Sequence, residues 1–225
     1  MTLIVGMVGG QAGDAILITD CLAWPSDPAL APHTDVVKSI RINDALAVGA
    51  CGDALYANAI LARLVGWRID EATDRYRVLN DIETTGHGRP GLTYREAKRL
   101  IKRHMPILTE VSQLDDVEST QIFLASQGQA CSKLCVWQPS AGDRPRELKG
   151  SPRPPQAIVR YPIAELTDEV DTSIETWVLD EHRDLTQRIK ALLRHCHEAS
   201  RGGISRRAHM RRGRHGFRLE TVVVD

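Results

Sequence analysis

Short, largely apolar runs separated by turn residues dominate the N-terminal quarter of the chain. Residues 2–8 and 15–19 form one pair of such runs, separated by a glycine-rich segment, and 39–42 and 45–51 form a second pair around an Asn-Asp dipeptide. Glycine, asparagine and aspartate tolerate the positive φ that tight turns require. Both pairs therefore predict β-hairpins. A strand, rather than a helix, follows the first glycines, which argues against a nucleotide-binding loop.

Apolar residues at helical spacing predict three helices. The first begins near Asp53. Thr93 and Glu96 form a capping box for the second, which we expect to end or kink before Pro106 because proline lacks the N–H that a helix interior needs. The third covers residues 185–196 and is strongly amphipathic. Its apolar stripe consists of Leu185, Ile189, Leu192, Leu193 and Cys196.

Further strands are predicted toward the C-terminal end. Runs at 120–126 and 133–137 favour strands, and 204–210 with 217–224 favour a closing hairpin. The stretch 139–155 contains five prolines and is interpreted as a long loop. Strands, helices, strands, a helix and strands, in this order, favour an α+β fold with helices outside antiparallel sheets.

Composition narrows the class of protein. The chain has 225 residues, of which 42% are hydrophobic and 26% charged, proportions that exclude a disordered, collagen-like or coiled-coil protein. No apolar run approaches the roughly 20 residues of a membrane span. Five scattered cysteines fit a reducing compartment, so we expect a cytoplasmic protein. Nothing marks an internal boundary, and residues 1–225 are expected to form one domain.

Charge is distributed unevenly although the total is zero. Between Arg194 and Arg218 there are eight arginines and one glutamate, a local balance of +7, so the remainder carries −7. This segment could bind a polyanion, or it could form the charged rim of a self-associating protein. Phe217 alone supplies an aromatic ring there, which argues against nucleic acid and favours self-association.

The second residue carries the first candidate chemistry. Met1 is commonly removed when the next residue is small, and removal would leave Thr2 with a free amine. A hydroxyl and an amine on one residue supply a nucleophile and its general base together. Thr2 is therefore a candidate catalytic nucleophile, although many proteins begin with Met-Thr for no such reason.

The order of three further residues gives Thr2 a context. Taken singly, Asp20 fits a turn cap, Lys38 a solvated strand flank and Gly52 a turn residue. Together with Thr2, their order along the first four strands resembles that of the proteasome β-type peptidases, which are N-terminal nucleophile hydrolases. The resemblance implies that Thr2, Asp20 and Lys38 are catalytic. It also implies that the Gly52 N–H forms the oxyanion hole.

The C-terminal part resembles the same family less closely. The resemblance covers residues 2–66 well and 183–224 fairly, where a helix, an acidic residue, Gly-Gly and a closing hairpin follow in the family's order. Glu198 takes the acidic position usually held by Asp, which makes it a supporting site residue. Arg201 stands where the family usually has Ser. These departures touch the groups that orient the amine and its water.

The resemblance implies a four-layer αββα sandwich, in which two antiparallel sheets are flanked by helices. It implies hydrolysis of amide bonds in peptide or protein substrates without a cofactor, and assembly into a ring or related homo-oligomer with an unidentified unfoldase as a possible partner. The alternative is a catalytically inactive scaffold or adaptor subunit, which retention of Met1 would favour. We expect no metal, because Cys131 and Cys135 lack the tight zinc-knuckle spacing and His195 and His197 cannot face one way on a helix.

Overall fold

The computed structural model describes most of the chain. The described residues are 3–10, 14–23, 29–52, 54–65, 89–111, 120–128, 131–138, 144–150, 155–160, 177–180, 182–213 and 216–224. Within them the protein is α+β, with two five-stranded antiparallel sheets and three helices. This confirms the predicted class.

The first sheet joins the two ends of the chain. Its order is β10-β9-β2-β1-β8, and its strands are β1 (Ile4–Gly9), β2 (Asp14–Asp20), β8 (Gln156–Arg160), β9 (Arg207–Arg212) and β10 (Arg218–Val223). The predicted N-terminal hairpin is confirmed, with Ile4 opposite Thr19 and Gly9 opposite Asp14. The C-terminal hairpin is confirmed as well, and β9 pairs with β2.

The second sheet contains the remaining strands in the order β3-β4-β5-β6-β7. They are β3 (Ser39–Asn43), β4 (Leu46–Cys51), β5 (Gln121–Gln127), β6 (Ser132–Trp137) and β7 (Arg146–Lys149). The second predicted hairpin is β3–β4, and the two central strands correspond to β5 and β6. The prediction of a loop over 139–155 was wrong in part, because β7 lies inside this stretch and pairs with β6.

The helices are α1 (Ala54–Val65), α3 (Tyr94–Val111) and α5 (Leu185–Ala199). The capping box at the start of α3 is confirmed. The Thr93 N–H donates to Glu96 Oε2 at 2.9 Å, and the Glu96 N–H donates to Thr93 Oγ1 at 3.3 Å. Of the predicted end or kink before Pro106, the end was wrong, since α3 continues to Val111. All five residues of the predicted stripe of α5 are buried.

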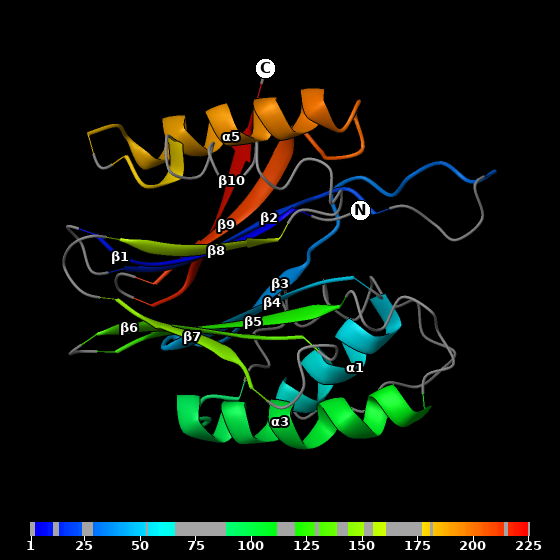
Figure 1. Ribbon diagram of the computed structural model, residues 1–225, viewed down its shortest axis with the longest axis vertical. Coiled ribbons are helices and arrows are strands. Elements are labelled where there is room, and N and C mark those ends of the chain that lie inside the picture. Colours follow the sequence, from blue (N-terminus) through cyan, green and yellow to red (C-terminus); the bar gives the residue numbers. More distant parts are fainter. Residues whose placement is uncertain are drawn as a thin grey trace.

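Three apolar clusters hold these elements together. One packs α1 and α3 against the second sheet, another packs α5 against the first sheet, and the third joins residues of both sheets. Strand β1 shows the alternation behind this arrangement, because Val5 and Met7 belong to the cluster with α5 whereas Ile4 and Val8 belong to the cluster between the sheets. Figure 1 shows α5 beside β9 and β10 at one end of the molecule, and α1 and α3 at the other end.

Close approach between the sheets leaves no room for a side chain at Gly6. A Cβ there would lie 2.6 Å from Leu134 Cδ2 on β6.

None of the described helices combines the length and the apolar character that crossing a bilayer demands.

Candidate functional site

Asp20 ends β2 and is fully buried. Its Oδ1 accepts hydrogen bonds from the Lys38 ammonium at 2.8 Å and from the Leu3 N–H at 2.9 Å. Its Oδ2 accepts from the Leu22 N–H at 3.0 Å. One carboxylate thus connects the start of β1, the end of β2 and the residue that precedes β3.

Lys38 is the cationic partner of this carboxylate, and its side chain is only 9% exposed. Besides Asp20, its ammonium donates to the backbone carbonyl of Leu22. The Lys38 carbonyl accepts from the Ala50 N–H at 3.1 Å, which ties its backbone to β4. Both ends of the lysine are therefore fixed, and the charged end is held close to Asp20.

Leu3 brings the N-terminal end of the described chain to the same carboxylate. Its N–H contacts Asp20 Oδ1, and its carbonyl accepts from the Asp20 N–H at 3.1 Å. The nitrogen that touches Asp20 is the amide nitrogen of the peptide bond to Thr2. Thr2 itself, the candidate nucleophile, lies outside the described residues, as does Met1.

Gly52 follows β4 directly and has φ +97°. A Cβ at this position would lie 2.4 Å from Thr120 Cα, far inside any real contact. Both the backbone angle and the close approach of the chain therefore require glycine here. The candidate oxyanion donor thus occupies a turn whose shape tolerates no side chain.

The end of α5 approaches Asp20 through its buried face. Burial, together with the charge of Asp20, raises the pKa of the Cys196 thiol to about 12. Glu198, the predicted supporting residue, is exposed. Among the described residues no hydrogen bond or ion pair joins its carboxylate to Asp20 or Lys38. The structure therefore does not bring Glu198 into the group formed by Asp20, Lys38 and Leu3.

The turn after α5 has its own polar network, which the sequence analysis missed. The Ser200 hydroxyl donates to the His197 carbonyl at 3.1 Å and accepts from the Ile204 N–H at 3.0 Å. Arg201 adopts φ +52°, a backbone angle that non-glycine residues rarely adopt. Ser200 thus acts here as a turn-forming residue that directly precedes Arg201.

Arg211 is a further residue that sequence reasoning missed. It lies on β9, is fully buried, and reaches across to β3, where Nε and Nη2 donate to the Ser39 carbonyl at 3.0 and 2.6 Å. Nε also lies 3.1 Å from Ser39 Oγ. Arg211 therefore connects the two sheets at the residue that follows Lys38. The sequence of β9 gave no signal of this burial, because apolar residues alternating with polar ones are typical of a strand with one face in solvent.

The arginine-rich segment is partly neutralised within the chain. Arg207 pairs with Asp35 at 2.9 Å, and Arg212 pairs with the buried Asp14 at 2.6 Å. Two of the eight arginines in this segment therefore have acidic partners in the same chain. Arg206 and Arg218 remain exposed.

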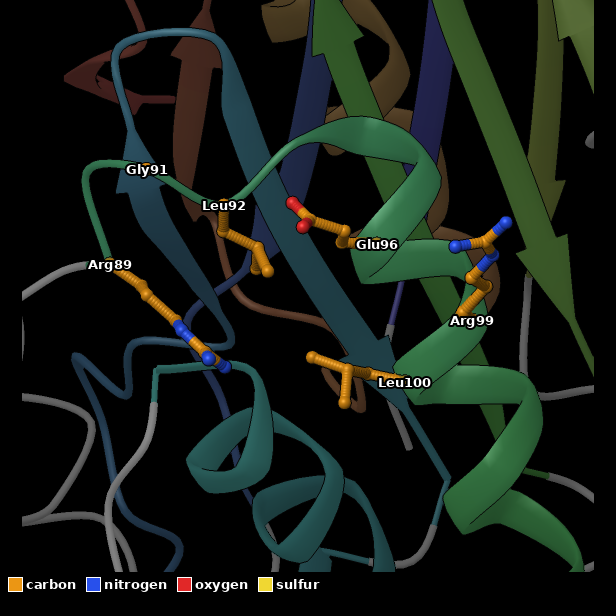
Figure 2. Close-up of a pocket in the computed structure, with 6 residues that line it drawn as sticks. All are labelled: Arg89, Gly91, Leu92, Glu96, Arg99 and Leu100. Carbon is orange, nitrogen blue, oxygen red and sulfur yellow. The ribbon is translucent and has the colours of Figure 1, made fainter.

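A separate pocket of about 370 Å³ opens at the start of α3 (Figure 2). Figure 2 shows Leu92 and Leu100 directed into it, with Arg89 and Arg99 on opposite sides. The carboxylate of Glu96 lies at its rim and is already bound to Thr93 in the capping box. The pocket shares no residue with the Asp20–Lys38 group, and its lining contains no hydroxyl or thiol nucleophile.

Comparison with known proteins does not assign the chain to a family. No family model matches the chain, and no curated protein matches it either.

Proposed function

We propose that the protein is an amide or peptide hydrolase that uses Thr2 as an N-terminal nucleophile after removal of Met1. The observation that carries this proposal is the buried Asp20–Lys38 ion pair, whose carboxylate also holds the Leu3 N–H. Thr2 is covalently attached to that nitrogen. A fixed positive charge therefore lies near the start of the chain, where an N-terminal nucleophile needs one.

A function explains the presence of this buried ion pair better than a contribution to stability does. Removing two charges from water carries a desolvation penalty that their attraction often fails to offset, so well-packed apolar residues would serve stability equally well. Here the carboxylate accepts hydrogen bonds from three donors, which keeps its charge fixed in position. Ion pairs held in this way are common in active sites, where a defined charge is needed.

In the proposed reaction, Thr2 Oγ attacks the substrate carbonyl, and the α-amine of Thr2 takes the hydroxyl proton. Lys38 stabilises the developing alkoxide, and Asp20 holds Lys38 in place. The amine then gives its proton to the leaving amine, which leaves an ester between Thr2 and the acyl group. Water, deprotonated by the same amine, then attacks this ester. The bond between the acyl carbon and Thr2 Oγ breaks, the amine returns its proton to Oγ, and the carboxylic acid leaves. The protons balance over the cycle, and no cofactor is required.

Gly52 supplies the oxyanion hole in this scheme. Its N–H would donate to the oxyanion of the tetrahedral intermediate, an interaction worth about 3–4 kcal/mol in the transition state. Gly52 has a positive φ, and its backbone lies so close to Thr120 that a Cβ would overlap that residue. A donor that is already oriented loses little on reorganisation during the reaction.

We also propose the finer architecture that this mechanism requires, a four-layer αββα sandwich over residues 1–225. The three apolar clusters support it, since one joins the two sheets and the other two cover each sheet with helices. The active site would lie at the end of the sandwich where β2 ends and β3 begins.

Intact-mass measurement and active-site labelling test the function. Protein from cells should lack the mass of Met1 and should be acylated once, at Thr2, by a β-lactone. Thr2→Ala should abolish labelling, whereas Asp20→Asn should slow it strongly in a folded protein. Labelling that persists at full rate in Thr2→Ala would show that Thr2 is not the nucleophile.

A catalytically inactive scaffold or adaptor subunit is the second candidate. The exposed carboxylate of Glu198 and the arginine at position 201 favour it, because neither supplies the usual group that orients the amine. A mass that retains Met1 throughout, together with no labelling, would support this candidate over the hydrolase.

We further propose that the protein is a cytoplasmic homo-oligomer. Arg206 and Arg218 keep their charges exposed, and the rest of each chain is net acidic, so copies of the chain offer one another complementary surfaces. Sedimentation at micromolar concentration should show an assembly that weakens with salt. Arg206→Glu should weaken it further, and a monomer at low salt would contradict the proposal.

A further inference from the structure

A group of three potential metal ligands lies beside the Asp20–Lys38 pair. Cys21, Asp35 and His209 each direct one ligand atom into this group, and all of these atoms lie within 4.8 Å of one another. We propose that Cys21, Asp35 and His209 bind a zinc ion. The binding itself does not depend on the proposed hydrolase activity.

Three different segments bring the ligands together. Cys21 follows β2, Asp35 lies shortly before β3, and His209 is in β9 opposite Thr19. The backbone holds the first two in place, since the Val36 N–H donates to the Cys21 carbonyl at 2.9 Å. The Cys21 N–H donates to the Arg207 carbonyl at 3.2 Å, which links the group to β9. The ligands are therefore positioned by main-chain hydrogen bonds before any ion binds.

No two of the three ligand atoms are more than 4.8 Å apart, and one separation is close to that of a tetrahedral site. His209 Nε2 lies 3.8 Å from Asp35 Oδ1. Zinc bonds of about 2.0–2.2 Å at the tetrahedral angle would place these two atoms about 3.3 Å apart, so a shift of about half an ångström brings them into position. Cys21 and His209 are buried, whereas Asp35 is exposed, so the fourth coordination position would face solvent and take water.

The types of ligand atom select the metal. A thiolate, an imidazole and one carboxylate are the donors that zinc prefers, whereas calcium and magnesium take oxygen ligands. On binding, the Cys21 thiol loses its proton to solvent, and its sulfur donates an electron pair to the ion. No oxidant or reductant takes part.

Arg207 would compete with a metal ion for the carboxylate of Asp35. Its guanidinium lies 2.9 Å from Asp35 Oδ1, the same atom that faces His209. A zinc ion would have to replace this contact. Arg207 is half exposed, with 45% of its side chain accessible, so it can move into solvent without leaving a cavity. Removal of its charge should therefore strengthen metal binding.

Cobalt(II) is the probe of choice, because a cobalt–thiolate bond produces a charge-transfer absorption and tetrahedral cobalt has intense visible bands. Titration of the full metal-free chain should produce both signals with one ion per chain, and zinc should abolish them. Cys21→Ser should eliminate the charge-transfer band. Cys131→Ser, which removes a half-buried thiol outside the group, should leave it unchanged.

Substitutions at two exposed residues, Asp35 and Arg207, test metal binding without disturbing the packed interior. Asp35→Asn should weaken binding by at least the roughly 10-fold that loss of a supporting group costs at other metal sites. Arg207→Gln should tighten it several-fold. Circular dichroism verifies the fold of each variant. Absence of the charge-transfer band from folded wild-type protein, or its persistence in folded Cys21→Ser, would overturn the proposal.

Discussion

Replacement of Lys38 by methionine tests the centre of the proposed site. The substitution removes the charge and keeps an unbranched side chain of similar volume, so the packing around the lysine stem changes little. Asp20 would remain fully buried with two donors, the Leu3 and Leu22 N–H groups. The Leu22 carbonyl would lose its ammonium donor.

Two magnitudes follow from this geometry. Removing one partner of a buried ion pair costs about 3–5 kcal/mol of unfolding free energy, and the two remaining donors to Asp20 place the expected loss near 3 kcal/mol. A single charge-assisted contact to the developing alkoxide is worth about 2–4 kcal/mol, which is about 30- to 1000-fold in the rate of acylation. Since domains usually have 5–15 kcal/mol of stability, the variant should remain folded at 25 °C.

Urea unfolding and the rate of β-lactone labelling measure these effects separately. Lys98→Met is a matched control, because Lys98 forms an ion pair of 2.6 Å with Glu147 whose side chains are 28% and 30% exposed. The control should lose at most about 1 kcal/mol and should label at the wild-type rate. Lys38→Arg, which restores the charge on a different geometry, should recover stability more than rate.

One result would refute the reasoning about Lys38. If folded Lys38→Met is acylated at the wild-type rate, the ammonium contributes nothing to the transition state, and the Asp20–Lys38 pair has a structural role only. A stability loss no larger than that of the Lys98 control would show in addition that water reaches the pair.

The remaining predictions concern the residues around this pair and the buried thiols. Gly52→Ala should lower the unfolding free energy by at least about 2 kcal/mol in a urea titration, because φ is positive and a Cβ would overlap the neighbouring backbone. Gly91→Ala is the control, since a Cβ there would meet nothing within 4 Å, and it should change the free energy by less than about 0.5 kcal/mol. Arg211→Met removes the donors to Ser39 and should cost about 2 kcal/mol by urea unfolding; an unchanged midpoint would show that Arg211 does not stabilise the contact between the sheets. Burial raises the pKa of three thiols to about 12 from an ordinary value of 9.0, and these are Cys21, Cys135 and Cys196. The folded state therefore keeps these protons after the unfolded state has lost them, so the thiols' contribution to stability should be unchanged below about pH 8 and should be lost between pH 9 and 12. Iodoacetamide at pH 8 should label the half-buried Cys131 first.

Helices and strands whose apolar residues recur at regular spacing were predictable from sequence, whereas those that depend on tertiary contacts were not. The stripe of α5 and the N-terminal hairpin follow directly from apolar spacing. Strand β7 has only Leu148 as an apolar residue, so no alternation reveals it, and its pairing with β6 decides its structure. In α3, Ile101 and Met105 pack into the core just before Pro106, and this packing offsets the local cost of proline within the helix.

In the candidate site, too, the features that depend on tertiary contacts could not be predicted from the residue types. The contact between Asp20 and Lys38 spans 18 residues, and only the resemblance to a known family suggested that the two act together. The role of Leu3 depends on its main chain, which leaves no signal in residue types. Arg211 was missed because charged residues are expected in solvent, whereas here the guanidinium is buried and bound to a backbone carbonyl.

The place of β9 in the first sheet has a consequence for the synthesis of the protein. β9 covers the outer edge of β2, and its Arg212 pairs with Asp14, 198 positions earlier in the chain. A nascent chain therefore carries β2 with an open edge until β9 has also left the ribosome, and such edges are prone to pair with other chains. Asp20 and Cys21 likewise lack their neighbours Ala208 and Arg207 until β9 has been synthesised. A chain that stops before Arg207 would therefore leave the edge of β2 unpaired and would be open to aggregation and to degradation.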